Sequence, residues 1–377
     1  MMKFLEQLPN FLFFTGKGGV GKTSLACATA VQLADLGKRV LLVSTDPASN
    51  VGQVFGIPIG NKVTPIGSVP RLYGLEIDPQ AAAQIYRDKI VGPVRGVLPE
   101  NVVKGIEEQL SGACTTEIAA FDEFTALLTD EAIHRDFDHV IFDTAPTGHT
   151  IRLLQLPGAW SGFLDEGKGD ASCLGPLAGL EKQREKYNSA VQALSDPNRT
   201  RLMLVTRAQA SSLREADRTH DELSAIGFKR QYLIVNGVLA QADTKEDPLA
   251  LAVWRREQAA LAAMPDGLKT LPVDSVSLKS FNLVGLAALR QLLAEGAVAS
   301  QDAIVRLPKL QAPDLATLVD SLVGEGHGLI MLMGKGGGGQ DNDCCRCSRR
   351  VGQSRISRPP HYLRSRRTSY RNTGRLS

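Results

Sequence analysis

Short hydrophobic runs alternate with longer amphipathic segments along most of the chain. The runs have the length and the β-branched or aromatic content of buried strands. We expect strands at 11–15, 39–44, 139–143, 201–206, 231–236 and 267–272. Apolar residues at helical spacing predict helices at 22–36, 108–128, 180–194, 212–226 and 248–263. This alternation predicts the α/β class, with a doubly wound, mostly parallel sheet that binds ligands at the carboxyl ends of its strands.

The alternation of predicted strands and helices is regular in one long part of the chain and absent from the rest. The regular alternation covers residues 1–294, which we expect to form one folded domain. Residues 295–327 are less periodic and contain two prolines, so we expect a linker there. Residues 328–339 begin with another short hydrophobic run and read as the remnant of a second domain. Beyond them the periodicity ends, and we expect a disordered basic tail at 340–377.

The positive charge of the chain lies in this tail. The 377 residues carry a formal net charge of +3. Residues 340–377 hold ten Arg, no Lys and two Asp, and without them the chain has 33 basic and 38 acidic residues, a charge of −5. The body is therefore mildly acidic, and we expect no nucleic acid as a partner.

The sequence predicts neither a membrane span nor a secretion signal. No apolar run approaches the roughly 20 residues that a membrane helix needs, and the run at 11–14 is too short for a signal-peptide core. The six cysteines stand at 27, 114, 173, 344, 345 and 347, scattered or crowded into the tail, which is not a disulfide framework. We therefore expect a soluble, cytoplasmic protein in a reducing compartment.

The glycine-rich segment 16–24 carries the strongest chemical signal. It reads Gly-Lys-Gly-Gly-Val-Gly-Lys-Thr-Ser, between the first expected strand and the first expected helix. Such a loop directs backbone N–H groups and the positive end of a helix dipole at phosphate oxygens. Lys22 is expected to neutralise the β- and γ-phosphates, and the Thr23 hydroxyl to ligate Mg²⁺. The predicted ATP-binding residues are Gly16, Lys17, Gly18, Gly19, Val20, Gly21, Lys22, Thr23 and Ser24.

Polar residues follow other expected strands. Asp46 can orient or deprotonate an attacking water and hold a Mg²⁺-bound water, although an Asp before a proline is also an ordinary turn. Asp143 ends an apolar strand and is expected to hold Mg²⁺ through water. Asn236 and the segment from Pro272 onward are candidates for adenine contact, and ordinary loop residues are an equal alternative.

Lys17 narrows the class of ATPase. A second lysine at the start of the loop resembles the signature of the deviant Walker A, or phosphate-loop, ATPases. The resemblance implies that Lys17 reaches across a dimer to the partner's nucleotide and acts in catalysis together with Lys22 and Asp46. A solvated lysine is the alternative. Residues 334–339 repeat the start of the loop as Gly-Lys-Gly-Gly-Gly-Gly, 318 positions further along, which hints at a two-site protein.

Longer motifs resemble the arsenical pump-driving ATPase family. They are Asp-Thr-Ala-Pro-Thr-Gly-His at 143–149, Ser-Thr-Asp-Pro-Ala-Ser-Asn at 44–50, Cys-Thr-Thr-Glu-Ile-Ala-Ala-Phe at 114–121 and Ala-Ser-Cys-Leu-Gly-Pro at 171–176. The resemblance implies an ATPase of two homologous halves that is stimulated by arsenite or antimonite and energises an integral membrane pump. It also implies a cytoplasmic protein held at the inner membrane through that pump, and it allows an arsenic metallochaperone as a further partner.

The same resemblance implies a metalloid site. Cys114, His149 and Cys173 match the family's metalloid ligands in this half. The chemistry fits, because As(III) and Sb(III) are soft centres that prefer thiolates. Spacing alone does not indicate such a site, and without the resemblance each cysteine reads as a small core residue. Cys27, in the helix after the phosphate loop, is expected to serve packing.

The tail has the pattern of a shifted reading frame. The codons permitted for the residues from Gly339 onward can also be read one base later. In that frame they can encode Gly-Lys-Thr-Thr-Thr-Ala-Ala, which completes the second phosphate loop. The same shift turns 361–368 into Thr-Thr-Ser-Asp-Pro-Ala-Ala-His, with the recovered Lys and Asp 24 positions apart, as Lys22 and Asp46 are. We therefore expect a single-base frameshift, a tail without function, and no second nucleotide site. The metalloid ligands of this half would then be incomplete unless two chains pair.

Two other functions share the expected fold. A targeting ATPase for tail-anchored membrane proteins uses a Cys-x-x-Cys zinc site and a Met-rich groove, whereas the body here has no Cys-x-x-Cys and the whole chain has six Met. A partition-type ATPase that binds DNA is disfavoured by the acidic body. This chain either forms a homodimer in place of the missing half or is inactive, and we expect at most a weak ATPase that arsenite does not stimulate.

Overall fold

The computed structural model describes residues 2–46, 51–144, 180–244, 247–294 and 315–323. The chain divides into two compact units, Met1–Val298 and Ala299–Ser377. Helix α13 (Leu315–Val323) is the described part of the second unit, and it lies within the segment that the sequence suggests as a linker. All other described elements belong to the first unit.

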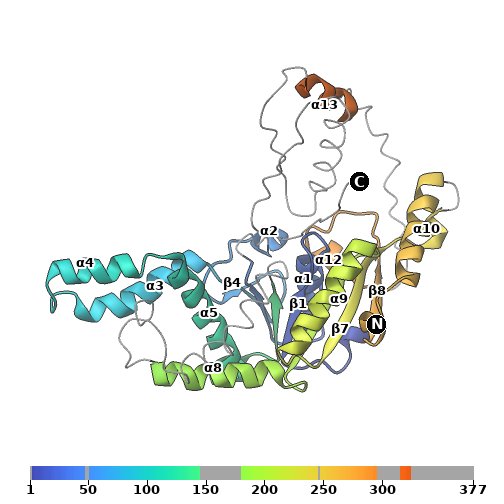
Figure 1. Cartoon of the computed structure of the whole chain (residues 1–377). Helices are drawn as coiled ribbons and strands as arrows, with labels where there is room; N and C mark the ends of the chain where they lie inside the picture. Colours follow the sequence, from blue (N-terminus) through green and yellow to red (C-terminus); the bar gives the residue numbers. More distant parts are fainter. Residues whose placement is uncertain (1, 47–50, 145–179, 245–246, 295–314, 324–377) are drawn as a thin grey trace. The chain divides into compact units, whose positions relative to one another are not determined.

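One eight-stranded sheet organises the first unit (Figure 1). The strands are β1 (Phe11–Thr15), β2 (Val40–Ser44), β3 (Thr64–Pro65), β4 (Leu72–Glu76), β5 (His139–Asp143), β6 (Thr200–Thr206), β7 (Gln231–Val238) and β8 (Val273–Ser277). Their order across the sheet is β3-β4-β2-β5-β1-β6-β7-β8. Neighbours are parallel, except that β3 is antiparallel to β4. The predicted α/β fold with a mostly parallel sheet is confirmed.

Helices cover both faces of this sheet. Phe11 and Phe13 of β1 pack in one buried cluster, whereas Leu12 and Phe14 pack in another, because successive side chains of a strand point to opposite faces. With both faces covered, the strand is an unbroken hydrophobic run. The helices are α1 (Lys22–Asp35), α2 (Val51–Phe55), α3 (Pro79–Val91), α4 (Glu100–Gln109), α5 (Ala113–Thr129), α6 (Glu131–Asp136), α8 (Leu180–Ser195), α9 (Ala210–Ala225), α10 (Pro248–Ala262), α11 (Asp266–Lys269) and α12 (Leu286–Leu292).

Aromatic rings fill the layer between the sheet and helix α5. Phe13 stacks on Phe142 with ring centroids 4.4 Å apart, and Phe124 of α5 meets Phe142 edge-on at 5.3 Å. Each fully buried side chain of this size stabilises the fold by about 1.5–3 kcal/mol. This packing fixes β1 and β5, the two strands whose carboxyl ends carry the phosphate loop and Asp143.

The prediction of a strand at 267–272 is wrong. The segment begins with the short helix α11, and the last strand, β8, starts only at Val273. Leu268 is buried on one side of the helical turn, and Asp266 and Lys269 pair on its exposed side at 2.8 Å. Only Val276 of β8 is fully buried, so this edge strand lacks the hydrophobic run by which the central strands are recognised.

The prediction of one helix at 108–128 is also wrong, because two helices meet there. Helix α4 ends at Gln109 and α5 starts at Ala113, with Gly112 as its extended N-cap residue. The Ser111 hydroxyl donates to the carbonyl of Glu108 at 2.6 Å and closes the end of α4. Strands β3 and β4 and helix α3 were not predicted. Strand β3 has only two residues, and Gly74 interrupts the hydrophobic run of β4.

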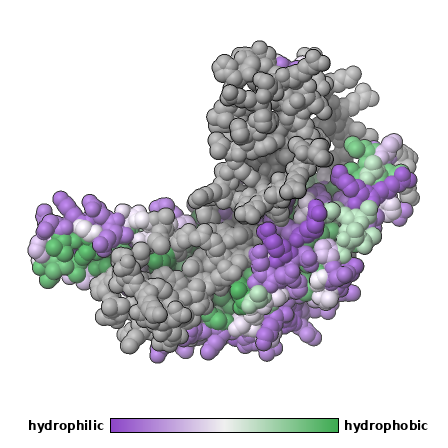
Figure 2. Space-filling model, in the orientation of Figure 1, coloured by the Kyte–Doolittle hydropathy of each residue, from purple (hydrophilic) through white to green (hydrophobic). Residues whose placement is uncertain are grey.

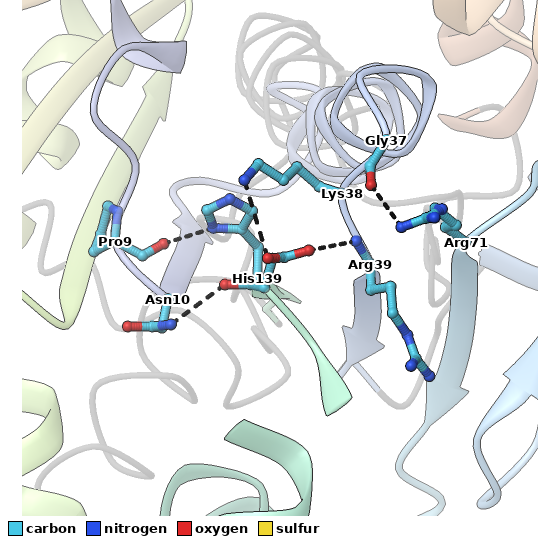
Figure 3. A network of polar contacts seen from close by, with 8 residues as sticks. Pro9, Asn10, Gly37, Lys38, Arg39, Arg71 and His139 are labelled. Carbon is cyan, nitrogen blue, oxygen red and sulfur yellow. Dashed lines mark hydrogen bonds and ion pairs between the residues drawn. The ribbon is translucent and has the colours of Figure 1, made fainter. Parts of the chain in front are cut away.

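A polar network holds the amino-terminal edge of the sheet together (Figure 3). The backbone N–H of Arg39 donates to the Asp138 carboxylate at 2.7 Å, and the Asn10 amide donates to the Asp138 carbonyl at 3.3 Å. His139 Nδ1 lies 2.8 Å from the carbonyl oxygen of Pro9, which can only accept, so this nitrogen donates. These bonds join the starts of β1, β2 and β5 at the edge opposite the phosphate loop.

Candidate nucleotide-binding site

The glycine-rich segment forms a tight loop between β1 and α1. Gly16 has φ 149° and Gly21 has φ 96°, backbone conformations that favour glycine. A Cβ at Gly16 would overlap the carbonyl oxygen of Val205 on β6, and one at Gly21 would overlap the side-chain amide of Asn236 on β7. Glycine is therefore required at both ends of the loop, where β6 and β7 pack directly against its backbone. A tight glycine loop before a helix N-terminus is the kind of loop whose backbone N–H groups bind phosphate.

Lys22 is the buried cation of the loop. As the first residue of α1 it directs Nζ back to the carbonyl oxygen of Lys17, to which it donates at 3.3 Å. Burial lowers the pKa of Lys22, and the nearby carboxylates of Asp143, Asp46 and Glu215 raise it in that order. An ammonium among three carboxylates can exchange contacts with phosphate oxygens without leaving the loop.

Asp143 ends β5 beside the loop and is almost fully buried, with 1% of its surface exposed. Among the described residues, no group makes a well-formed hydrogen bond to either carboxylate oxygen, and the Thr23 hydroxyl is the hydrogen-bonding group that acts on it. Burial raises the pKa of Asp143 to about 6; the Thr23 hydroxyl and Lys22 oppose the rise, and Asp46 adds to it. A buried carboxylate without a well-formed hydrogen bond fits a site for a hydrated divalent cation.

Asp46 follows β2 at the same edge. Its backbone N–H donates to the Ser44 hydroxyl at 3.3 Å, and the N–H of Thr45 donates to the carbonyl of Asp143 at 3.0 Å. Ser44 is in register with Asp143 across the parallel pair of strands. The structure therefore brings the predicted catalytic and magnesium residues Lys17, Lys22, Thr23, Asp46 and Asp143 to one edge of the sheet.

Lys17 is half-exposed and makes an ion pair within its own chain. Its Nζ lies 3.8 Å from the carboxylate of Glu215, a side chain of α9 that is only 6% exposed. Glu215 was missed by sequence reasoning, because it lies within a helix and no motif marks it. Its buried negative charge gives Lys17 a defined position beside the loop.

The two candidates for adenine contact, Asn236 and Pro272, lie at opposite ends of the parallel strands. Asn236 is buried and donates to the carbonyl of Val20 at 2.8 Å, so it ties β7 to the phosphate loop. Pro272 precedes β8 and accepts from the N–H of Leu233 at 2.9 Å. Since β8 is parallel to β7, Pro272 lies at the amino-terminal edge, and the structure does not bring it to the loop. The chain returns to the carboxyl edge after Ser277.

The predicted metalloid ligands are only partly within the described residues. Cys114 is the second residue of α5, and His149 and Cys173 lie outside the described ranges. In the part of the chain that the structure describes, no three His, Cys, Asp or Glu side chains form a ready-made metal cluster. Cys27 is fully buried in α1 and burial raises its pKa, so its expected packing role is confirmed.

A search of the described residues for membrane-crossing helices finds none that is both long and apolar enough.

Comparison with known proteins agrees with this geometry. The family model of the anion-transporting ATPases matches residues 9–295. The chain is 63% identical over 346 residues to an arsenical pump-driving ATPase of Escherichia coli, covering 90% of this chain and 58% of that protein. It is 61% identical over 342 residues to the protein of the same name from Acidiphilium multivorum, with the same coverage of each chain. The chain thus spans about 58% of the length of these relatives.

A more distant relative is covered more completely. The ATPase get3 of Schizosaccharomyces japonicus is 32% identical over 283 residues, which are 70% of this chain and 85% of that protein. The phosphate loop, the family match from residue 9 to residue 295 and these identities agree, and the chain belongs to the anion-transporting ATPase family.

Proposed function

We propose that the chain binds Mg-ATP at residues 16–24 and hydrolyses it as the first half of the ATPase of an arsenite or antimonite efflux system, which couples ATP hydrolysis to extrusion of the metalloid by a membrane pump. The observation that carries this proposal is that the tight glycine loop and the buried Lys22 lie beside the buried carboxylate of Asp143, whose oxygens have no well-formed hydrogen bond among the described residues. Phosphate and a divalent cation together satisfy all three, since phosphate accepts from the loop and Lys22 while the cation balances Asp143.

Each residue has a distinct part in the proposed reaction. The loop N–H groups and Lys22 hold the phosphates and balance the charge that develops on the transferred group. Thr23, Asp46 and Asp143 would hold Mg²⁺, which supplies Lewis-acid charge at the phosphate oxygens when bound. Asp46 orients the attacking water and accepts its proton. Lys17 leaves Glu215 to reach a nucleotide at a facing site, and Asn236 with the segment after Ser277 contacts adenine.

The metalloid and the pump are proposed from the relatives. Two relatives that share more than 60% of aligned residues are named arsenical pump-driving ATPases. Cys114, His149 and Cys173 supply soft ligands for As(III) or Sb(III) in this proposal. The proposed partners are an integral membrane arsenite pump, an arsenic metallochaperone and a second copy of the chain. In this proposal the chain lies in the cytoplasm and is held at the inner membrane through the pump.

The reading frame that encodes residues 340–377 determines whether the chain has a second nucleotide site. We propose that one added base separates 340–377 from the reading frame of a second ATPase half, so that ligands and a nucleotide site are missing here. Sequencing the DNA around codons 336–341 decides this point, because an in-frame read without an extra base would rule it out.

The experiment measures the ATPase rate with and without arsenite, together with the solution mass, for this chain and a frame-restored version. We expect slow hydrolysis without arsenite stimulation for this chain, and stimulation for the restored version. Strong stimulation of a monomeric chain would contradict the missing-ligand argument. A restored chain that ignores arsenite and antimonite would contradict the metalloid proposal.

A targeting function for hydrophobic membrane segments is the second candidate. Apolar side chains are exposed along α3, α4 and the turn between them, at Ile85, Val97, Leu98 and Val102. Figure 2 shows hydrophobic surface over this end of the molecule. Binding of a tail-anchor peptide that is lost when Val97 and Val102 are both changed to Asp would favour this function at this surface. Unchanged binding by the variant would exclude the surface, and no binding by the wild type would exclude the function.

A further inference from the structure

Glu76 lies next to the proposed magnesium site although no motif marks it. It is the last residue of β4, and the parallel register pairs it with Ser44 of β2. Ser44 is in turn paired with Asp143 of β5. The carboxyl ends of three adjacent strands therefore carry Glu76, the residues before Asp46, and Asp143 side by side.

The Glu76 side chain holds the start of helix α2. Its Oε1 accepts from the backbone N–H of Gly52 at 3.0 Å. Gly52 is the second residue of α2, and the first N–H groups of a helix have no partner within the helix. A Cβ at Gly52 would come within 2.8 Å of the carbonyl of Ile57, so the backbone at this position is packed too closely to shift freely.

The negative charge of Glu76 acts on the neighbouring Asp143. This charge is close enough to Asp143 to raise the pKa of that buried group further, as the charge of Asp46 also does. Asp143 already has no well-formed hydrogen bond to either oxygen among the described residues. The contribution of Glu76 follows those of burial and Asp46 in size, and it indicates that the two carboxylates are close enough to interact.

We propose that Glu76 is a positioning residue, which fixes the first turn of α2 and thereby one end of the segment that carries Asp46. The other end is fixed at Ser44, whose hydroxyl accepts from the N–H of Asp46. Asp46 and Gly52 are six positions apart in the sequence. This inference rests on the proposed role of Asp46 in orienting water, because a displaced Asp46 slows hydrolysis more than it weakens ATP binding.

The test compares Glu76→Ala with Glu76→Gln. The glutamine keeps an oxygen that accepts from Gly52 and removes the charge, whereas alanine removes both. We expect E76A to lower kcat about tenfold or more with KM for ATP changed by less than about twofold, and E76Q to stay within about twofold of the wild type in both. The control is Asp138→Ala, which removes a carboxylate that accepts from a backbone N–H at the opposite edge of the sheet.

Amide hydrogen exchange gives a readout that does not depend on turnover. We expect faster exchange at the start of α2 in E76A and unchanged exchange there in E76Q and D138A. The inference is overturned if E76A keeps the wild-type kcat and exchange, or if E76Q loses as much kcat as E76A. A wild-type chain that neither binds nor hydrolyses Mg-ATP would overturn the proposed function itself, which is a different result.

Discussion

Asp143 shows how a single residue can trade stability for ligand binding. Its pKa lies near 6 in the folded chain and about 3.8 in an unfolded one, so its ionised form is disfavoured by folding. The shift corresponds to roughly 3 kcal/mol. Above pH 6 both states are ionised and the full cost is present. As the pH falls from 6 towards 4, only the folded chain takes up the proton, and the cost disappears.

We therefore predict that Asp143→Asn stabilises the ligand-free chain. The free energy of unfolding should rise by up to about 3 kcal/mol at pH 7.5, and the difference from the wild type should shrink towards zero near pH 4. Urea denaturation at both pH values measures this. A destabilised variant at pH 7.5, or a gain that does not depend on pH, would contradict the buried ionised carboxylate.

Lys17 gives a second prediction at this scale. Because its ammonium lies 3.8 Å from the buried Glu215 carboxylate, Glu215→Gln should free it and raise its rate of modification by an amine-reactive acylating reagent. Mass spectrometry of the Lys17 peptide after brief labelling measures the rate. Glu222→Gln is the matched control, since Glu222 lies on the same helix and pairs with Arg218 at 3.4 Å. Equal labelling of all three proteins would show that the ion pair does not hold Lys17.

At the level of elements, the sequence predicts best where one pattern dominates. The hydrophobic run of β1, the glycines of the loop and the helical spacing of α1 agree, and this unit forms as expected. Strand β8 was missed because only Val276 of this edge strand is buried, and the break between α4 and α5 was missed because a single turn closed by Ser111 separates the two helices. Glu76 was missed because β4 was not predicted, and an acidic residue at the end of a strand can be recognised only when the strand is known.

The amino-terminal segment illustrates a long-range contact that no local pattern reveals. Arg201 of β6 is buried and donates to the carbonyl oxygens of Phe4, Glu6 and Gln7 at 2.9–3.1 Å. These contacts join residues almost two hundred positions apart and attach the segment before β1 to the sheet.

Arg201→Met should therefore destabilise the chain by about 2–4 kcal/mol, because it leaves the buried carbonyl oxygen of Phe4 and two partly buried ones without their donor. Arg201→Lys should recover only part of the loss, since one ammonium cannot reproduce the planar fork of donors. Thermal and urea unfolding measure both variants. Wild-type stability in R201M would show that water replaces the guanidinium at no cost.

In the whole molecule, the proposed hydrolysis requires two nucleotide sites that face each other. If Lys17 acts on a neighbouring nucleotide, Lys17→Ala and Asp46→Ala should each lack ATPase activity alone and regain it when mixed. The mixed dimer contains one site with an intact Asp46 that receives Lys17 from the other chain. ATPase assays of the mixture over a range of protein concentrations test this. Activity in K17A alone, or none in the mixture, would contradict action across a dimer.

Residues 16–24 and Asp143 together form the proposed Mg-ATP site, and an equilibrium titration of ATP measures whether they act together. ATP is titrated into the wild type, Lys22→Ala and Asp143→Asn, with and without Mg²⁺. We predict that Mg²⁺ strengthens ATP binding by the wild type at least about tenfold, that D143N loses this gain, and that K22A binds weakly in both conditions. Equal affinities for all three proteins, or ATP binding by the wild type that Mg²⁺ does not change, would contradict the account.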